Sequence, residues 1–130
     1  MSALAYIIAS GRSTNTQRFD IAQMHNIERW FTENVVSESI WILERPEFME
    51  LLKFARKGDT LVICSVQSLG RCSFELYDAF KALQTKEVNV LSLLEGFDLS
   101  SRSGATFLKT LTTLAELDRT ITRHESRQRK

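Results

Sequence analysis

Three short runs of apolar residues divide the chain, and each has the length and the β-branched content of a buried strand. They are LAYIIA at 4–9, TLVICSV at 60–66 and VNVLSLL at 88–94. A weaker apolar run, SIWIL at 39–43, predicts a further strand between the first two. Strands that are apolar at nearly every position are buried on both faces, which is typical of a parallel sheet covered by helices.

Apolar residues at helical spacing occupy the segments between these runs. The residues that mark the four predicted helices are Ile21, Met24, Ile27 and Phe31 in the first, Pro46 at the start of the second, Ser73 as the cap of the third and Gly104 before a long last helix. The alternation of strands and helices predicts an α/β domain built on a mostly parallel sheet. Functional sites in such sheets collect at the carboxyl ends of the strands, where residue 10 and the 67–71 loop fall.

Composition limits the chain to one ordinary globular domain covering residues 1–130. Apolar residues make up 43% and charged residues 25%, and no Ser- or Gly-rich linker interrupts the sequence. The net charge is only +1, but the end of the chain is basic. Its basic residues are Arg119, Arg123, Arg127, Arg129 and Lys130. This tail predicts weak contact with DNA phosphates, although cations at a helix C-terminus have a purely structural explanation as well.

The two cysteines predict neither a disulfide nor a metal site. Cys64 lies inside an apolar run, as a small buried hydrophobic residue would, and Cys72 is not near a histidine in the sequence. Free cysteines indicate a reducing compartment, and ALAYIIA at 3–9 lacks the features of a signal peptide and the length of a membrane span. We therefore expect a cytoplasmic protein with no cofactor, no metal and no membrane contact.

Six segments in order resemble the serine recombinases, the family of resolvases and DNA invertases. They are AYIIAS at 5–10, QRFDI at 17–21, ERPEF at 44–48, KGDTLVI…LGR at 57–71, LLEGFDLSSRSG at 93–104 and TLAELDR at 113–119. The resemblance implies the family's three-layer catalytic domain with a long C-terminal helix. It also implies metal-free chemistry, in which a serine forms a phosphoserine link to DNA and arginines stabilise the charge on the phosphoryl oxygens.

The resemblance also implies which residues would carry that chemistry. Ser10 occupies the position of the nucleophile, four residues after Tyr6. Ser13 is a competing choice, because RSTNTQ at 12–17 is similar to the family's V-S-T-N-D-Q, but the match of Tyr6 and of QRFDI favours Ser10. The matching arginines are Arg45, Arg71 and Arg119, and Ser39 matches a polar residue after the second strand.

Several charges of the family pattern are missing from this chain. Ile8 stands where the family has an arginine two residues before the nucleophile. Gln67 and Ser68 replace the acid and the first arginine of L-D-R-L-G-R, and Glu125 lies near the place of a further arginine. Because each preorganised transition-state donor is worth about 10²–10³ in rate, we expect impaired catalysis. We also expect no helix-turn-helix module within 1–130.

The last helix predicts self-association. Phe107, Leu108, Leu111, Leu114 and Ile121 form an apolar stripe on a helix too long to lie wholly on so small a domain. The resemblance implies a two-fold dimer or a higher homo-oligomer through residues 103–124, with an intact recombinase as a further candidate partner. Three functions follow: a divergent recombinase, a non-catalytic oligomerising or regulatory relative, and, on topology alone, a nucleotide- or flavin-binding domain.

Overall fold

The computed structural model describes residues 2–9, 12–34 and 40–128, and describes side chains within these ranges except at 12–14 and 118–128. Within these ranges four strands and four helices alternate, and a short fifth strand precedes the last helix. The strands are β1 (Ala3–Ala9), β2 (Arg29–Asn34), β3 (Thr60–Ile63), β4 (Asn89–Ser92) and β5 (Phe97–Asp98). The helices are α1 (Arg12–Met24), α2 (Pro46–Phe54), α3 (Ser73–Thr85) and α4 (Arg102–Gln128), with 3-10 turns η2 (Ile42–Glu44) and η3 (Val66–Ser68).

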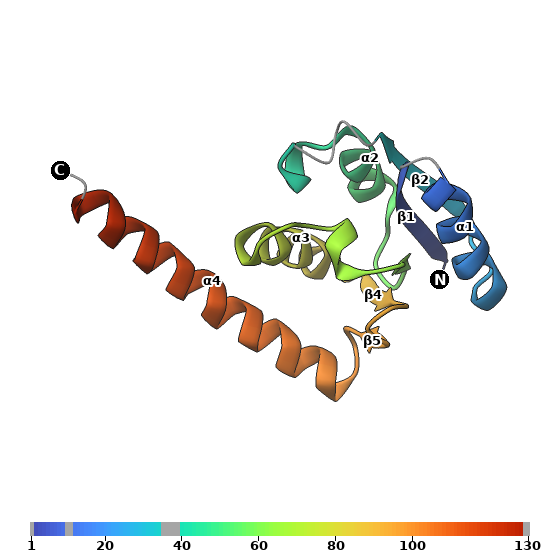
Figure 1. The fold of residues 1–130 in the computed structure, drawn as a ribbon. Coiled ribbons are helices and arrows are strands. Elements are labelled where there is room, and N and C mark those ends of the chain that lie inside the picture. Colours follow the sequence, from blue (N-terminus) through green and yellow to red (C-terminus); the bar gives the residue numbers. More distant parts are fainter. Residues whose placement is uncertain (1, 10–11, 35–39, 129–130) are drawn as a thin grey trace.

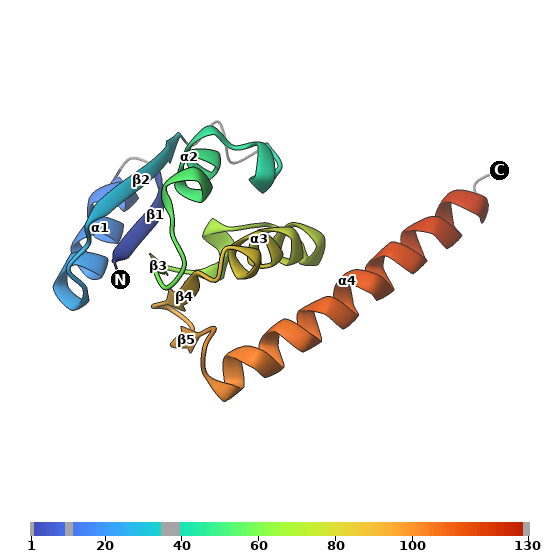
Figure 2. The same ribbon diagram turned by 180° about the vertical axis from the view of Figure 1, so that it is seen from behind.

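The five strands form one sheet in the order β2-β1-β3-β4-β5. The pairs β1–β2, β1–β3 and β3–β4 are parallel, and only the short β5 runs antiparallel to its neighbour. Figures 1 and 2 show α1 on one face of this sheet and α2 and α3 on the other. The predicted three-layer α/β fold with a mostly parallel sheet is therefore confirmed.

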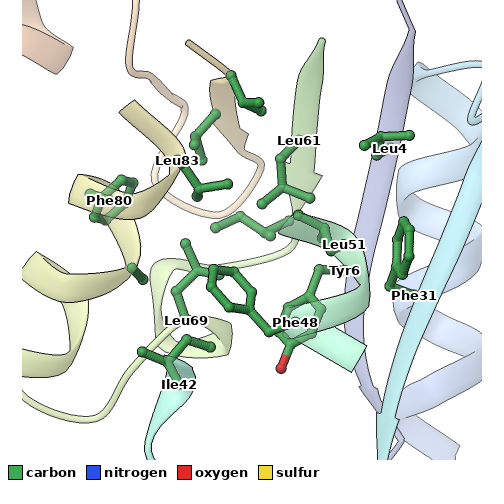
Figure 3. Packing of buried hydrophobic residues seen from close by; sticks show 14 of the residues in the cluster. Leu4, Tyr6, Phe31, Ile42, Phe48, Leu51, Leu61, Leu69, Phe80 and Leu83 are labelled. Carbon is green, nitrogen blue, oxygen red and sulfur yellow. The ribbon is translucent and has the colours of Figure 1, made fainter. Parts of the chain in front are cut away.

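Alternation along β1 divides the core into two layers, because successive side chains of a strand point to opposite faces. Leu4, Tyr6 and Ile8 pack against α2 and α3 in the larger cluster, whereas Ala5 and Ile7 pack against α1. Figure 3 shows the larger cluster, in which the rings of Tyr6 and Phe48 meet edge to face at 5.6 Å.

The predicted strand at 39–43 is wrong in its described part. Ile42 begins a 3-10 turn instead, and Ile40, Trp41 and Leu43 beside it are more than a third exposed. The second strand lies earlier, at Arg29–Asn34, where buried side chains alternate with more exposed ones along an edge strand of the sheet. The predicted first helix was correspondingly too long, since α1 ends at Met24 and Phe31 belongs to β2.

Two predicted helix starts also shift. Cys72, not Ser73, is the N-cap of α3, and no side chain caps that helix from the N-cap position. The last helix begins at Arg102, so Gly104 lies inside its first turn. A Cβ atom at this glycine would lie 2.1 Å from the carbonyl oxygen of Asp98, so only glycine permits α4 to start so close to β5.

Helix α4 packs on α3 through its first turns and then extends away from the body (Figures 1 and 2). Leu111 and Ala115 are buried on the body, while Leu114 and Leu117 are 45% and 52% exposed. The helix has 27 residues, a length of about 40 Å. Part of the apolar stripe predicted for self-association is thus covered by the domain itself.

Candidate functional site

Near the carboxyl end of β1 the buried side chain is apolar: it is that of Ile8. Ile8 is only 7% exposed and belongs to the core cluster beneath α2 and α3. Its backbone N–H donates to Oε1 of Gln17 at 3.3 Å, and Nε2 of Gln17 donates to its carbonyl oxygen at 2.9 Å. Because β3 pairs with β1 only as far as Ala5, this α1 amide satisfies the backbone of Ile8 on the β3 side, while β2 remains the neighbour on the other side. The predicted nucleophile, Ser10, lies outside the described residues, as does Ser39.

The loop after β3 is tied to the loop after β4 by one carboxylate. Glu95 accepts hydrogen bonds from the hydroxyl of Ser65 at 2.9 Å, from the N–H of Val66 at 3.3 Å and from the hydroxyl of Ser92. Partial burial acts to raise the pKa of Glu95, but these hydrogen bonds outweigh it and the pKa lies below its usual value. Glu95 therefore stays ionised and holds the start of the 65–71 loop in place.

The predicted site residue Arg45 lies wholly inside the protein. It has no exposed surface, and its Nε donates to the carbonyl oxygen of Ile40 at 2.9 Å. Its Nη1 donates to the carbonyl oxygen of Ser68 at 3.1 Å, and its Nη2 lies 3.6 Å from Oε1 of Glu75. The guanidinium thus joins the segment before α2 to the loop after β3 and to α3.

Arg71, at the end of the same loop, has the opposite environment. Its side chain is exposed, and its backbone N–H donates to Oε1 of Glu75 at 2.9 Å. Gln67 is also exposed, whereas Ser68 is buried and offers its carbonyl oxygen to Arg45. Among the predicted arginines with a described side chain, Arg71 is therefore the one that solvent and ligands can reach.

A buried carboxylate, that of Glu33, joins β1, β2 and α2. Oε2 of Glu33 accepts the hydroxyl of Tyr6 at 3.0 Å and the N–H groups of Glu47 at 3.1 Å and Phe48 at 3.2 Å. Glu33 thus caps the N-terminus of α2 from a neighbouring strand, where a negative charge suits the helix dipole. Burial raises the pKa of Tyr6 above its usual value, so its hydroxyl remains a donor.

The sequence and the fold agree with one family of known proteins. The sequence model of the family described as "Resolvase, N terminal domain" matches residues 8–130. The chain belongs to this family. Two solved structures share the fold. The N-terminal catalytic domain of TP901-1 integrase has a TM-score of 0.72 and 22% identity, and the match covers 92% of this chain and 98% of that one. A resolvase family site-specific recombinase from Streptococcus pneumoniae has a TM-score of 0.74 and 14% identity, and the match covers 98% of this chain and 95% of that one.

Similar curated proteins include resolvases and DNA invertases. The chain is 30% identical over 125 residues to the DNA-invertase hin of Salmonella typhimurium, which covers 93% of this chain and 63% of the relative. It is 27% identical over 104 residues to the Transposon Tn917 resolvase of Enterococcus faecalis, covering 80% and 55%. The resemblance stated from sequence motifs is confirmed, and the protein is a serine recombinase-type domain related to site-specific recombination. The chain spans between about half and two thirds of the length of these relatives.

The remaining predicted site residues of this resolvase domain lie where side chains are not described. Helix α4 contains positions 119, 123 and 127, but the side chains of Arg119, Arg123 and Arg127 fall outside the described set. Arg129 and Lys130 follow the described residues. The structure consequently brings Arg45 and the Arg71 backbone to one carboxylate and leaves the other predicted residues unplaced.

Sequence reasoning missed the three carboxylates that organise this end of the resolvase domain. Glu95 lies in a motif that carried the resemblance, and its role could have been suspected from that position. Glu33 and Glu75 gave no such signal, since acidic residues in a strand or in the first turn of a helix are usually exposed. In the described part of the chain, no three side chains of the metal-binding types come together, and no helix is long and apolar enough to cross a membrane.

Proposed function

We propose that this resolvase domain is catalytically impaired and serves a recombination system mainly through assembly. The observation that carries the proposal is Ile8. The family pattern has an arginine at this position, and here the side chain is an aliphatic group packed into the core. An isoleucine cannot donate to a phosphoryl oxygen, and the Gln17 amide already occupies the backbone groups of that residue.

The loop after β3 supports the same proposal. Ser68 stands where the pattern has a further arginine, and it is buried with its carbonyl oxygen bonded to Arg45. Gln67 replaces the carboxylate of the pattern. Since one missing transition-state donor typically lowers the rate by about 10²–10³, two missing arginines would together remove most of the acceleration.

The test is covalent attachment to DNA. One protein keeps the chain as it is, and a second carries Ile8→Arg, Gln67→Asp and Ser68→Arg, with the same sequence-specific DNA-binding module fused after Lys130 in both. We expect no Ser10-dependent phosphoserine adduct from the first within the time in which the second forms one. The Ser10→Ala variant of each is the control. An adduct from the unaltered chain at a rate within about tenfold of the restored one would refute the impairment.

A second candidate function is an active recombinase in which Ser10 attacks DNA with help from Arg45, Arg71 and Arg119. The exposed Arg71, on the loop between β3 and α3, favours this candidate. The adduct experiment decides between the two, because the active candidate requires a Ser10-dependent link without any restored charge.

Assembly through the last helix is the positive part of the proposal. Leu114 and Leu117 lie exposed on a helix that projects from the body, and such unpaired apolar side chains favour an interface. We propose a homodimer or higher homo-oligomer through residues 103–124, with an intact recombinase as an alternative partner. Leu117→Asp should lower the mass measured by light scattering, whereas Ala105→Asp, at an exposed position on the opposite side of α4 from Leu114, should not. A mass unchanged by Leu117→Asp would place the interface elsewhere.

DNA contact through the basic tail is a further part of the proposal. Its side chains belong to Arg123, Arg127, Arg129 and Lys130. Contacts to phosphates alone release counterions and carry no sequence information, so the affinity for a random duplex should equal that for a recombination site and fall steeply with salt. Fluorescence titrations at two salt concentrations measure both effects, and a clear sequence preference would contradict this mode of binding.

A further inference from the structure

Glu75 occupies an unusual position in the first turn of α3. Its side chain is almost fully buried, although glutamates near helix starts are usually exposed. Oε2 accepts the N–H of Ile42 at 2.9 Å, and Oε1 accepts the N–H of Arg71 at 2.9 Å. One carboxylate therefore joins α3 to the segment before α2 and to the loop after β3.

The same carboxylate faces Arg45. Nη2 of Arg45 lies 3.6 Å from Oε1 of Glu75, and the guanidinium also donates to the backbone carbonyls of Ile40 and Ser68 and interacts with the hydroxyl of Tyr6. A buried arginine that is matched by one buried glutamate and by carbonyl oxygens is stabilised in the interior. For Arg45 to bind a DNA phosphate, these contacts would have to break.

The loop approaches Glu75 so closely that its sequence is restricted. A Cβ atom at Gly70 would lie 2.9 Å from Cβ of Glu75 and 2.9 Å from the backbone nitrogen of Leu76. Glycine at this position lets the backbone of Arg71 reach the carboxylate while its side chain stays exposed.

We propose that Glu75 is a positioning residue that gives the two arginines opposite roles. It retains Arg45 inside the domain as a link between three segments, and it fixes the backbone of Arg71 so that this side chain is presented to solvent from the loop after β3. The presentation of Arg71 to a DNA phosphate rests on the proposed function. The positioning of the 68–71 loop does not.

The proposal depends on Glu75 having two acceptor oxygens. A glutamine of the same shape has one acceptor oxygen and one NH₂ group. Its oxygen can accept the N–H of either Ile42 or Arg71, and its NH₂ group then faces the other N–H, which is also a donor. The Glu75→Gln variant should therefore release one of the two segments while it fills the same volume. Asp78, one turn further along α3, accepts from Nε1 of Trp41 at 2.8 Å and provides the matched control as Asp78→Asn.

Cys72 provides a local probe, because it is exposed and follows Arg71 directly. A nitroxide label on Cys72, in a Cys64→Ala background, should give the spectrum of an ordered side chain in the parent and in Asp78→Asn. In Glu75→Gln the spectrum should become more mobile when the released group is the Arg71 amide, whereas release of the Ile42 amide is detected by its hydrogen exchange. Hydrogen exchange of the Arg71 or the Ile42 amide should accelerate by about tenfold or more in Glu75→Gln, as expected for the loss of a bond to a charged acceptor.

The two measurements together decide the proposal. An unchanged label spectrum together with unchanged exchange at both amides would overturn it. If Glu75→Gln alone fails to fold, the double variant Arg45→Met with Glu75→Gln removes the unpaired buried charge, and the same two measurements compare it with Arg45→Met alone, which lacks the bond to Ser68 equally.

A DNA measurement separates this inference from the proposed function. Arg71→Gln should lower the slope of log affinity against log salt by about one for a random duplex. Arg56→Gln should leave the slope unchanged, because Arg56 is an exposed arginine that precedes the amino end of β3. If the slope does not respond to Arg71→Gln while the Cys72 label responds to Glu75→Gln, the contact with DNA is refuted and the positioning role stands.

Discussion

Replacement of Glu33 tests whether a side chain of β2 holds α2 on the sheet. Glu33→Ala removes the acceptor of the Tyr6 hydroxyl and of the Phe48 N–H, both of which are buried contacts. Each buried donor left without a partner costs about 1–3 kcal/mol, and the desolvation of the carboxylate is relieved in return. We expect a loss of about 3 kcal/mol of unfolding free energy, which lowers Tm by roughly 10 °C in a domain of this size.

Chemical denaturation followed by circular dichroism measures this loss. Glu33→Gln can keep one acceptor oxygen for the contacts of Oε2 but loses the negative charge at the helix N-terminus and the longer contact from the Glu47 N–H to Oε1, so it should cost about 1 kcal/mol. Glu44→Gln, an exposed acid of η2, is the control and should leave the midpoint unchanged. A Glu33→Ala variant within about 1 kcal/mol of the parent would refute the reasoning that these donors depend on Glu33.

Three further predictions concern backbone geometry and pH. Glu87 has a φ of 57° just after α3, so Glu87→Gly should stabilise the fold by about 0.5–1 kcal/mol in urea titrations, despite the loss of its exposed ion pair with Lys57. Gly104→Ala should destabilise by about 2 kcal/mol or more although alanine favours helices, because its Cβ would meet the backbone of β5 and the following turn. The carboxyl of Glu95 should titrate, by NMR, below the usual glutamate pKa of about 4.3. Its stabilisation of the loop is therefore complete above about pH 4.3 and is lost as the pH falls through the lower pKa of the folded state. A titration midpoint at or above about 4.3 would contradict this.

The sequence predicted the buried centre of the sheet correctly because its strands are apolar at nearly every position. β3 and β4 fall inside the predicted runs, and β1 covers its run at 4–9 and begins one residue earlier, at Ala3. The edge strand β2 was missed because one of its two buried positions is Glu33, which hides the alternation of apolar and polar residues. The false strand at 39–43 has an apolar composition for another reason: most of its described side chains lie at the surface of the turn that leads into α2.

The candidate site was predictable in its location and not in its internal contacts. Parallel topology places the loop after β3 at the carboxyl edge of the sheet, where the sequence put it. Whether an arginine in such a motif faces solvent or the interior depends on partners far away in the sequence. Arg45 is 30 residues from Glu75, whose place in α3 resembles that of any acid in a first helical turn.

The contacts that shape the loop after β3 explain how its frame is kept without the family's charges. Arg45 binds the backbone carbonyl of Ser68, and Glu75 binds the backbone N–H of Arg71, so neither bond depends on the side chain at those two positions. Glu95 likewise binds the backbone N–H of Val66. Because the loop is held through its main chain, replacement of an arginine or an acid at positions 67 and 68 removes a reactive group without removing a support. Loss of the carboxylate of Glu75 would have the opposite effect, since it would release the loop even if every charge of the family pattern were present.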